Sequence, residues 1–166
     1  LADKKNLLTS EQKNEIIKLL ANFSGHTGIA GGQELDLKFE NRKKNFKEII
    51  NMQRKKTGKL FSFCCFSAAQ IGGARTSEIK KLSKVGEDIG LLFQLADDFL
   101  DIKGTSKSTG KTVKKDRRKG KSTIVNLFGY DYAYKYANNL KIKILRNLKK
   151  HGKKAHDLCD IIDFIL

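Results

Sequence analysis

The sequence predicts an all-α fold that forms a single domain over residues 1–166. The chain contains no proline, which suits long and uninterrupted helices. Its apolar residues recur three and four positions apart over several stretches, which is the spacing of a helix face. No alternating run of polar and apolar residues is long enough to form a strand. The length of the chain allows one sizeable hydrophobic core.

The first predicted helix begins at Thr9 or Ser10, either of which can cap it. We expect it to run on through a glycine-rich stretch, residues 25–32, where each glycine costs a helix about 1 kcal/mol relative to alanine. These glycines are expected to allow a close approach of the backbone to another backbone or to a ligand. Polar residues 38–45 then break the helix.

A second helix is predicted over residues 46–69, and the glycines at 72–73 end it. Within this helix, Gly58 follows Lys56 and Thr57. A glycine at this point predicts a local kink, which would turn the side chains of Lys56 and Thr57 toward a cavity.

The remaining predicted helices follow the turn at the glycines at 72–73. One covers residues 77–102 and carries an apolar stripe that we expect to be buried, formed by Leu82, Val85, Ile89, Leu92, Phe93 and Ala96. Three shorter helices are predicted at residues 122–128, 130–148 and 156–166.

The end of the long helix carries an acidic triplet, Asp97, Asp98 and Asp101, which shares a helix face with Gln94. Hard divalent cations such as Mg²⁺ prefer oxygen ligands of this kind. Acidic residues on a helix more commonly form a solvated face. Here, however, carboxylates near the C-terminal end oppose the helix dipole, at about 0.3–1 kcal/mol each. No Lys or Arg lies between positions 88 and 102 to neutralise them, which favours a binding site.

A strongly basic loop, residues 103–121, follows the acidic triplet. It holds nine Lys or Arg residues and one Asp, a net charge of +8 that is half of the chain's +16. It also holds three glycines and almost no apolar residue. Carboxylates that hold a metal, next to lysines that attract an anion, indicate a metal-bridged anion, for which diphosphate is the natural candidate.

The acidic segment Gly-Leu-Leu-Phe-Gln-Leu-Ala-Asp-Asp-Phe-Leu-Asp resembles the second aspartate-rich motif of the trans-type polyprenyl diphosphate synthases, which include farnesyl and geranylgeranyl diphosphate synthases. Three more segments resemble family motifs in the same order and spacing. They are Gly31-Gly32-Gln33 with Asp36, then Lys56-Thr57-Gly58, and then the loop that contains Thr109-Gly110-Lys111 and Gly120-Lys121-Ser122-Thr123.

This resemblance implies the C-terminal half of the helical isoprenoid-synthase fold and a prenyl transfer from an allylic diphosphate to isopentenyl diphosphate. It implies Mg²⁺ as the cofactor, bound by Asp97, Asp98 and Asp101. It also implies that Lys56, Lys111 and Lys121 bind the allylic diphosphate, with Thr57 and Gln94 as nearby polar contacts. Phe93 would lie beside isopentenyl diphosphate, and Gln33 and Asp36 would line the cavity wall.

Two features of the family are missing from the sequence. The first aspartate-rich motif is absent, and so is the Gly-Lys-x-x-Arg segment that binds isopentenyl diphosphate. Asp157, Asp160 and Asp163 lack adjacent paired aspartates, and we interpret them as the polar side of an amphipathic helix. We therefore expect the chain to be a fragment of a longer enzyme that is homodimeric when full-length, and the fragment to be inactive alone.

The alternatives within and outside the family are a noncatalytic synthase subunit, a terpene cyclase or squalene-type synthase, and a basic nucleic-acid-binding module. The pI near 9.8 favours polyanion binding in general. The basic loop nevertheless has no aromatic residue on which bases could stack, so we expect no specific nucleic-acid partner. Retention of costly carboxylates argues against a purely noncatalytic subunit. The Lys-Thr-Gly and Gly-Lys-Ser-Thr segments fit chain-elongating synthases better than cyclases.

The location in the cell is predicted from cysteines and hydropathy. No run of 18 apolar residues predicts a membrane span. Cys64, Cys65 and Cys159 show neither a metal-binding spacing nor a pairing pattern, which suits the reducing cytoplasm. We expect Cys64 and Cys65 to be small core residues, because they lie in an apolar run.

Overall fold

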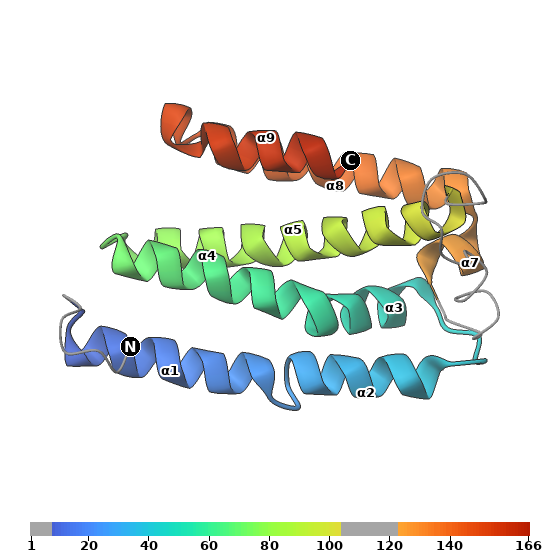
Figure 1. Cartoon of the computed structure of the whole chain (residues 1–166), viewed down its shortest axis with the longest axis horizontal. Coiled ribbons are helices and arrows are strands. Elements are labelled where there is room, and N and C mark those ends of the chain that lie inside the picture. Colours follow the sequence, from blue (N-terminus) through green and yellow to red (C-terminus); the bar gives the residue numbers. More distant parts are fainter. Residues whose placement is uncertain (1–7, 104–122) are drawn as a thin grey trace, which may run out of the picture.

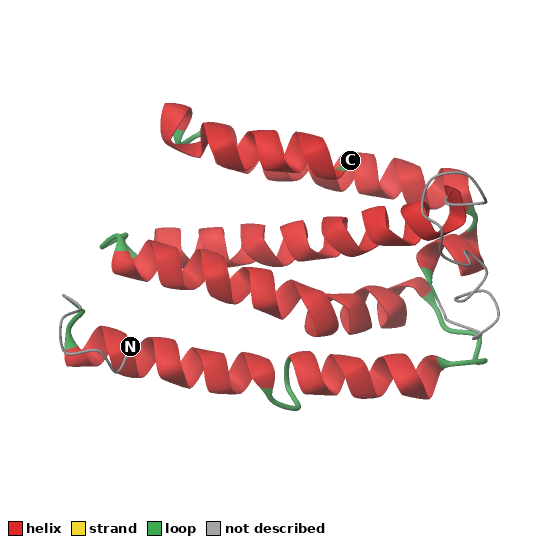
Figure 2. Cartoon of the chain, viewed as in Figure 1, coloured by secondary structure: helices red, strands yellow, loops and turns green. Residues whose placement is uncertain are grey.

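The computed structural model describes residues 8–103 and 123–166. Over these two ranges the chain forms helices joined by short turns, with no strand (Figure 2). The prediction of an all-α fold is therefore confirmed for the part of the chain that the structure describes. The predicted helix boundaries hold to within a few residues, except at two places in the first half.

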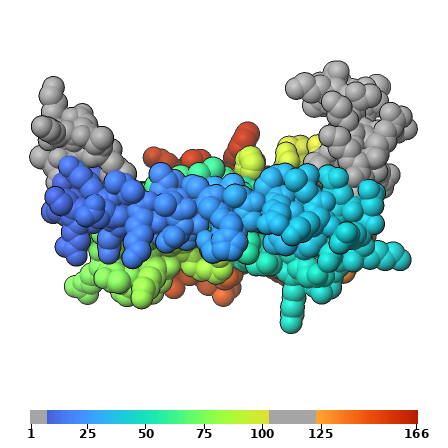
Figure 3. All heavy atoms as spheres, turned by 90° about the horizontal axis from the view of Figure 1, so that it is seen from below, coloured from blue at the N-terminus to red at the C-terminus, as the bar shows by residue number. Residues whose placement is uncertain are grey.

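The first exception is the glycine-rich stretch, where one helix was expected and two are found. Helix α1 spans Ser10–Ser24 and helix α2 spans Ile29–Phe39, and the two lie end to end (Figure 1). Thr9 caps α1 by accepting a hydrogen bond from the backbone N–H of Gln12, whose side chain accepts one from Thr9 in return. Together α1 and α2 form one long side of the molecule (Figure 3).

The second exception is the helix expected at residues 46–69. It consists of α3, Phe46–Gln53, a π-helical turn η1, Arg54–Gly58, and α4, Lys59–Ile71. The irregularity coincides with the predicted kink at Gly58, although its form is a widened turn. Such π-helical turns are rare and often occur at functional sites, because the wider turn changes the direction of the side chains.

Helix α5, Thr76–Lys103, is the longest helix and packs between α4 and α8 (Figure 1). Most of its predicted apolar stripe is buried, and Leu91, Leu92 and Leu95 are fully enclosed. The prediction of a buried position was wrong for Phe93, because its side chain is 47% exposed. It lies about 100° around the helix from Leu92, on the face that carries the acidic residues.

The C-terminal part consists of α7, Ile124–Phe128, α8, Tyr130–Lys149, a 3₁₀ turn η2, Gly152–Ala155, and α9, His156–Ile165. One hydrophobic core joins this part to α3 and α5. Its fully buried side chains are Ile49, Leu91, Leu92, Leu95, Ile124, Ile144, Leu148 and Ile162. Each contributes about 1.5–3 kcal/mol by burial, so the core fixes α5 against its neighbours.

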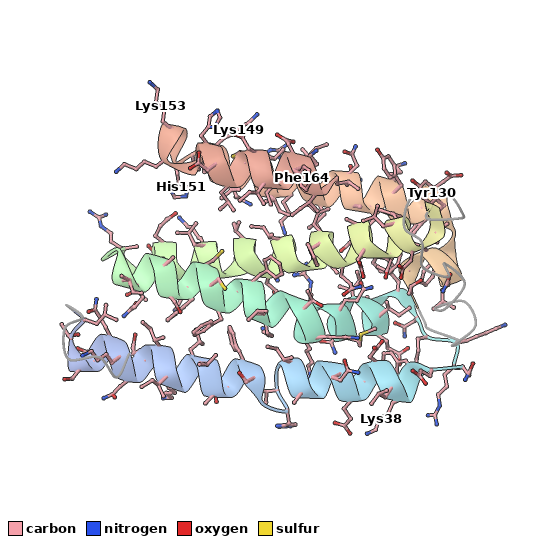
Figure 4. All side chains as sticks on the ribbon, in the orientation of Figure 1. Lys38, Tyr130, Lys149, His151, Lys153 and Phe164 are labelled. Carbon is pink, nitrogen blue, oxygen red and sulfur yellow. The ribbon has the colours of Figure 1, made fainter. Side chains whose placement is uncertain are left out.

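Several large apolar side chains lie outside this core. Phe164 on α9 is 91% exposed and Leu100 on α5 is 68% exposed, and Phe164 is labelled in Figure 4.

Cys64, expected in the core, is exposed, whereas Cys65 is partly buried. Burial, and secondarily the neighbouring Cys64, raises the pKa of Cys65 to about 11.

Within the described ranges, no helix combines the length and apolar character that crossing a bilayer requires.

Candidate active site

The π-helical turn η1 places Lys56 against helix α2. The Lys56 Nζ lies 2.5 Å from Asp36 Oδ2 in a partly buried ion pair. Gly32 makes this approach possible, because a Cβ atom at this position would lie 2.2 Å from the backbone nitrogen of Lys56. The expectation that the glycine-rich stretch serves a close backbone approach is confirmed at this glycine.

Thr57, the next residue of η1, faces helix α5. Its Oγ1 donates a hydrogen bond of 3.2 Å to Gln94 Oε1. Gly90, one turn before Gln94, allows the contact, because a Cβ atom there would lie 2.8 Å from the Cα of Gly58. The turn η1 is therefore held between two glycines, and its two polar side chains point to different helices.

Asp98 is buried next to Gln94, with only 7% of its surface exposed. Its Oδ1 accepts a hydrogen bond from Gln94 Nε2 at 3.4 Å, and its Oδ2 accepts one from Gln53 Nε2 at 3.2 Å. The three side chains Thr57, Gln94 and Asp98 thus form a chain of hydrogen bonds from η1 to the acidic end of α5.

Asp97 and Asp101 lie one turn apart on α5 and are exposed. This arrangement corrects the expectation that all three carboxylates point the same way, because Asp98 turns inward. Among the residues with described positions, no cluster of three or more carboxylate, imidazole or thiol groups could hold a metal alone. Two exposed carboxylates nevertheless fit Mg²⁺, which binds through one or two carboxylates, water and substrate phosphates.

A small cavity of about 30 Å³ connects these groups, a volume that suits a single water molecule. Its lining joins residues from α2, α3, η1, α5 and the start of α7: Asp36, Met52, Gln53, Lys56, Gln94, Asp98 and Thr123. Four of the residues proposed from the sequence line this cavity, namely Asp36, Lys56, Gln94 and Asp98. Residues more than 50 positions apart therefore share one polar centre.

The other residues expected in the site have different positions. Gln33 is exposed on α2 and does not line the cavity. Phe93 is exposed, and its ring contacts that of Phe61 at 5.7 Å between centroids. Lys111 and Lys121 lie outside the described residues, and their roles stay predictions.

Asp160 and Asp163 confirm the interpretation of α9 as an amphipathic helix. Asp160 pairs with His156 and Asp163 with Lys141, while Ile162 is fully buried on the opposite side. The Asp163–Lys141 pair joins α9 to α8, whereas the Asp160–His156 pair lies within α9.

Sequence reasoning missed Gln53 and a charged network around Glu87 and Asp88. Arg54 contacts both carboxylates, and Lys143 contacts the fully buried Asp88 at 2.7 Å. A sequence signal existed for Gln53, because it follows Ile49 and Met52 on the apolar side of α3. A polar residue at an apolar helix position is unusual and marks a specific contact.

An all-helical bundle that joins a lysine, two amides and an acidic helix end agrees with the helical isoprenoid-synthase fold that the motifs predict. A model described as Polyprenyl synthetase matches residues 3–163. The chain belongs to this family, which confirms the resemblance found in its motifs.

Named relatives agree with this membership. The chain is 35% identical to the farnesyl diphosphate synthase of Micrococcus luteus, over 96% of this chain and 55% of that protein. It is 31% identical to the geranylgeranyl diphosphate synthase of Cyanophora paradoxa, over 92% of this chain and 51% of that protein. The chain therefore spans about half the length of the curated relatives it matches.

Solved structures share the fold. A Helicobacter pylori geranyltransferase, complexed with magnesium and isoprenyl diphosphate, superposes with a TM-score of 0.78 at 32% identity. The match covers 97% of this chain and 53% of that one. A geranylgeranyl pyrophosphate synthetase from Pyrococcus horikoshii gives a TM-score of 0.85 at 26% identity, over 97% of this chain and 61% of the other.

Proposed function

We propose that this chain is the part of a prenyltransferase that binds the allylic diphosphate, in the synthesis of farnesyl or geranylgeranyl diphosphate. The observation that carries the proposal is the convergence of three separate segments. Asp36 contacts Lys56, Thr57 contacts Gln94, and Gln94 contacts Asp98. These segments are the ones whose residue types suit a metal-bound diphosphate, and family membership supports the same reaction.

In the proposed reaction the allylic carbon–oxygen bond breaks, and its electron pair leaves with the diphosphate. The double bond of isopentenyl diphosphate then attacks the allylic cation, and a proton is lost. Magnesium, when bound, supplies positive charge that stabilises the departing diphosphate. Asp97 and Asp101, which are exposed one turn apart on α5, would hold it.

Lys56 adds a fixed positive charge for the phosphate oxygens. In the structure Lys56 forms an ion pair with Asp36, which keeps the lysine ammonium group ordered beside the cavity. Phe93 and Phe61 form an apolar wall on the same side of α5. Such a wall excludes water, which would otherwise quench the cation.

The site is proposed to be one half of a two-sided clamp. Phe93, Asp97, Leu100 and Asp101 share one helix face, and all four are exposed. An exposed face that mixes carboxylates with large apolar groups is suited to a second acidic helix, with metal and substrate between the two. We infer that further residues supply this helix, and that the completed enzyme is a cytoplasmic homodimer.

The test is magnesium-dependent binding of inorganic diphosphate by the 166-residue chain, measured by calorimetry. We expect weak binding, and Asp97→Ala is expected to reduce the affinity at least tenfold. Asp160→Ala is the matched control, because it removes an exposed helical carboxylate on α9 and leaves the site intact. In the completed enzyme, Asp97→Ala is expected to abolish turnover.

Two results would contradict the proposal. Tight binding to a random DNA duplex without magnesium, together with no binding of diphosphate, would favour the basic nucleic-acid module. Turnover of allylic and isopentenyl diphosphates by the 166-residue chain alone would refute the two-sided clamp, because half of the metal ligands would then suffice.

A further inference from the structure

Gln53 is the last residue of α3, and its position is unusual for a polar side chain. It is 3% exposed, and its neighbours on the same helix face, Ile49 and Met52, are buried apolar residues. An apolar residue would fill this position without any polar group to satisfy. The amide therefore indicates a specific role.

The amide of Gln53 has a defined orientation. Its Nε2 donates to Asp98 Oδ2 at 3.2 Å, so the carbonyl oxygen must point away from the carboxylate. The reverse orientation would bring two acceptor oxygens together. Within the described residues, the Gln53 Oε1 is buried and has no hydrogen-bond partner. A buried acceptor without a partner is destabilising, so the contact with Asp98 is retained in spite of a cost.

Asp98 receives a second amide on its other oxygen, from Gln94 at 3.4 Å. Two amide donors, one on each oxygen, fix the plane of the carboxylate. An oriented carboxylate beside Asp97 is one of the acidic groups that a divalent cation would meet at this end of α5. Residues that orient the acidic groups of a metal site commonly change metal affinity by 10- to 100-fold.

We infer that Gln53 is a positioning residue, which holds Asp98 in the orientation that the metal–diphosphate site requires. Gln53 directly precedes η1, which carries Lys56 and Thr57. Its contact with Asp98 therefore also sets the position of the lysine side of the site relative to the acidic side. The inference rests on the proposed function, because it assigns Gln53 a role in that same site.

The test replaces Gln53 with methionine, an unbranched apolar side chain of similar length. Calorimetry with Mg²⁺ and inorganic diphosphate is expected to give about tenfold weaker binding for Gln53→Met in the 166-residue chain. In an Asp98→Asn background, the same substitution is expected to change the affinity less than twofold, because the carboxylate that it positions is gone.

Gln70→Met is the matched control. The Gln70 amide also donates to a carboxylate, Glu15 Oε2 at 3.0 Å, but this pair joins α1 to the C-terminal end of α4, about three helical turns beyond η1. We expect Gln70→Met to leave diphosphate affinity unchanged. Thermal unfolding without magnesium, measured for each variant, separates folding from positioning. A merely structural Gln53 would lower the unfolding temperature of Gln53→Met and leave its diphosphate affinity as in the unmodified chain.

The outcomes separate the two proposals. If Asp97→Ala weakens binding and Gln53→Met does not, the inference about Gln53 is overturned and the proposed function stands. If Gln53→Met weakens binding equally with and without Asp98, the positioning role is also overturned. Absence of any magnesium-dependent diphosphate binding by the unmodified chain overturns both.

Discussion

Helix α5 carries two pairs of adjacent acidic residues, Glu87–Asp88 and Asp97–Asp98, about 15 Å apart along the helix axis. The first pair contacts four cations from η1, α4, α5 and α8, namely Arg54, Lys59, Lys84 and Lys143. In the second pair, Asp98 accepts hydrogen bonds from two amides, and Asp97 is exposed.

The difference shows that one helix uses similar side chains for two purposes. The charge of Glu87 and Asp88 is neutralised within the fold, so this pair joins η1 and α8 to α5. In the second pair, two amides orient the Asp98 carboxylate, and the Asp97 carboxylate is exposed where a ligand can reach it. Two consecutive residues reach the two pairs, since Gln53 contacts Asp98 and Arg54 contacts Asp88.

The largest predicted effect is on folding, at the neutralised pair. Asp88→Ala removes the buried partner of Arg54 and Lys143. It is expected to cost about 2–4 kcal/mol of unfolding free energy, because two charge-assisted hydrogen bonds are lost. Asp97→Ala is expected to change the unfolding free energy by less than about 0.5 kcal/mol, because its side chain is exposed. Urea unfolding of both variants measures the difference. Similar losses in the two variants would contradict the division between the pairs.

The next effect concerns the glycine contact that lies between the pairs. Gly90→Ala brings a Cβ atom 2.8 Å from the Cα of Gly58, and is expected to cost about 1–3 kcal/mol by overpacking. Because it displaces η1, it is also expected to weaken diphosphate binding through loss of the Thr57–Gln94 hydrogen bond. Unfolding and calorimetry measure the two effects.

Gly72→Ala at the end of α4 is the control for that substitution, because its nearest neighbour would be 3.2 Å away and φ is negative. A smaller stability loss and normal diphosphate binding are expected. If Gly90→Ala binds diphosphate normally, then the close approach of η1 to α5 does not shape the site.

The fold could be predicted largely from the sequence, because apolar spacing, caps and the absence of proline are local signals. Thr9 and Gln12 form the cap that starts α1, and the glycines at 72–73 end α4 as predicted. The break between α1 and α2 was missed, since a glycine-rich stretch weakens a helix without fixing where the chain turns.

The site was predictable only in part, for a geometric reason. Asp97 and Asp98 are adjacent, so spacing alone places both near one helix face, about 100° apart. Which of them is buried depends on the packing of α3 against α5. The sequence marks Gln53 as a polar residue at an apolar position, but it contains no signal that the partner of Gln53 is Asp98. The same holds for Asp88, whose partners Arg54 and Lys143 come from distant segments.

A smaller effect is expected from pH at the neutralised pair. Burial would raise the pKa of Glu87, but hydrogen bonds from Lys84 and Lys59 outweigh it and lower this pKa below the ordinary value of 4.5. A carboxyl with a lowered pKa in the folded state stabilises the fold above its unfolded pKa. This stability is lost as the pH falls through the folded pKa.

Glu87→Gln is therefore expected to cost about 1–2 kcal/mol at neutral pH and progressively less below about pH 4.5. Urea unfolding between about pH 3 and pH 7 measures this. Asp160→Asn, at an exposed pair on α9, is the control and is expected to lack this dependence. A constant difference between Glu87→Gln and the unmodified chain over the whole range would exclude a charged Glu87 as the source of the stability.

The smallest effect is expected at the second pair, from the ligand itself. Magnesium with inorganic diphosphate, at about five times the dissociation constant, stabilises the folded state by about 1 kcal/mol. For a chain of this size, that raises the unfolding temperature by about 2–4 °C. The shift is expected to persist in Glu87→Gln and to disappear in Asp97→Ala or after removal of magnesium with EDTA. If the shift disappeared in Glu87→Gln instead, the prediction would be contradicted. The metal would then bind at the first pair, whose carboxylates contact Arg54 and the lysines.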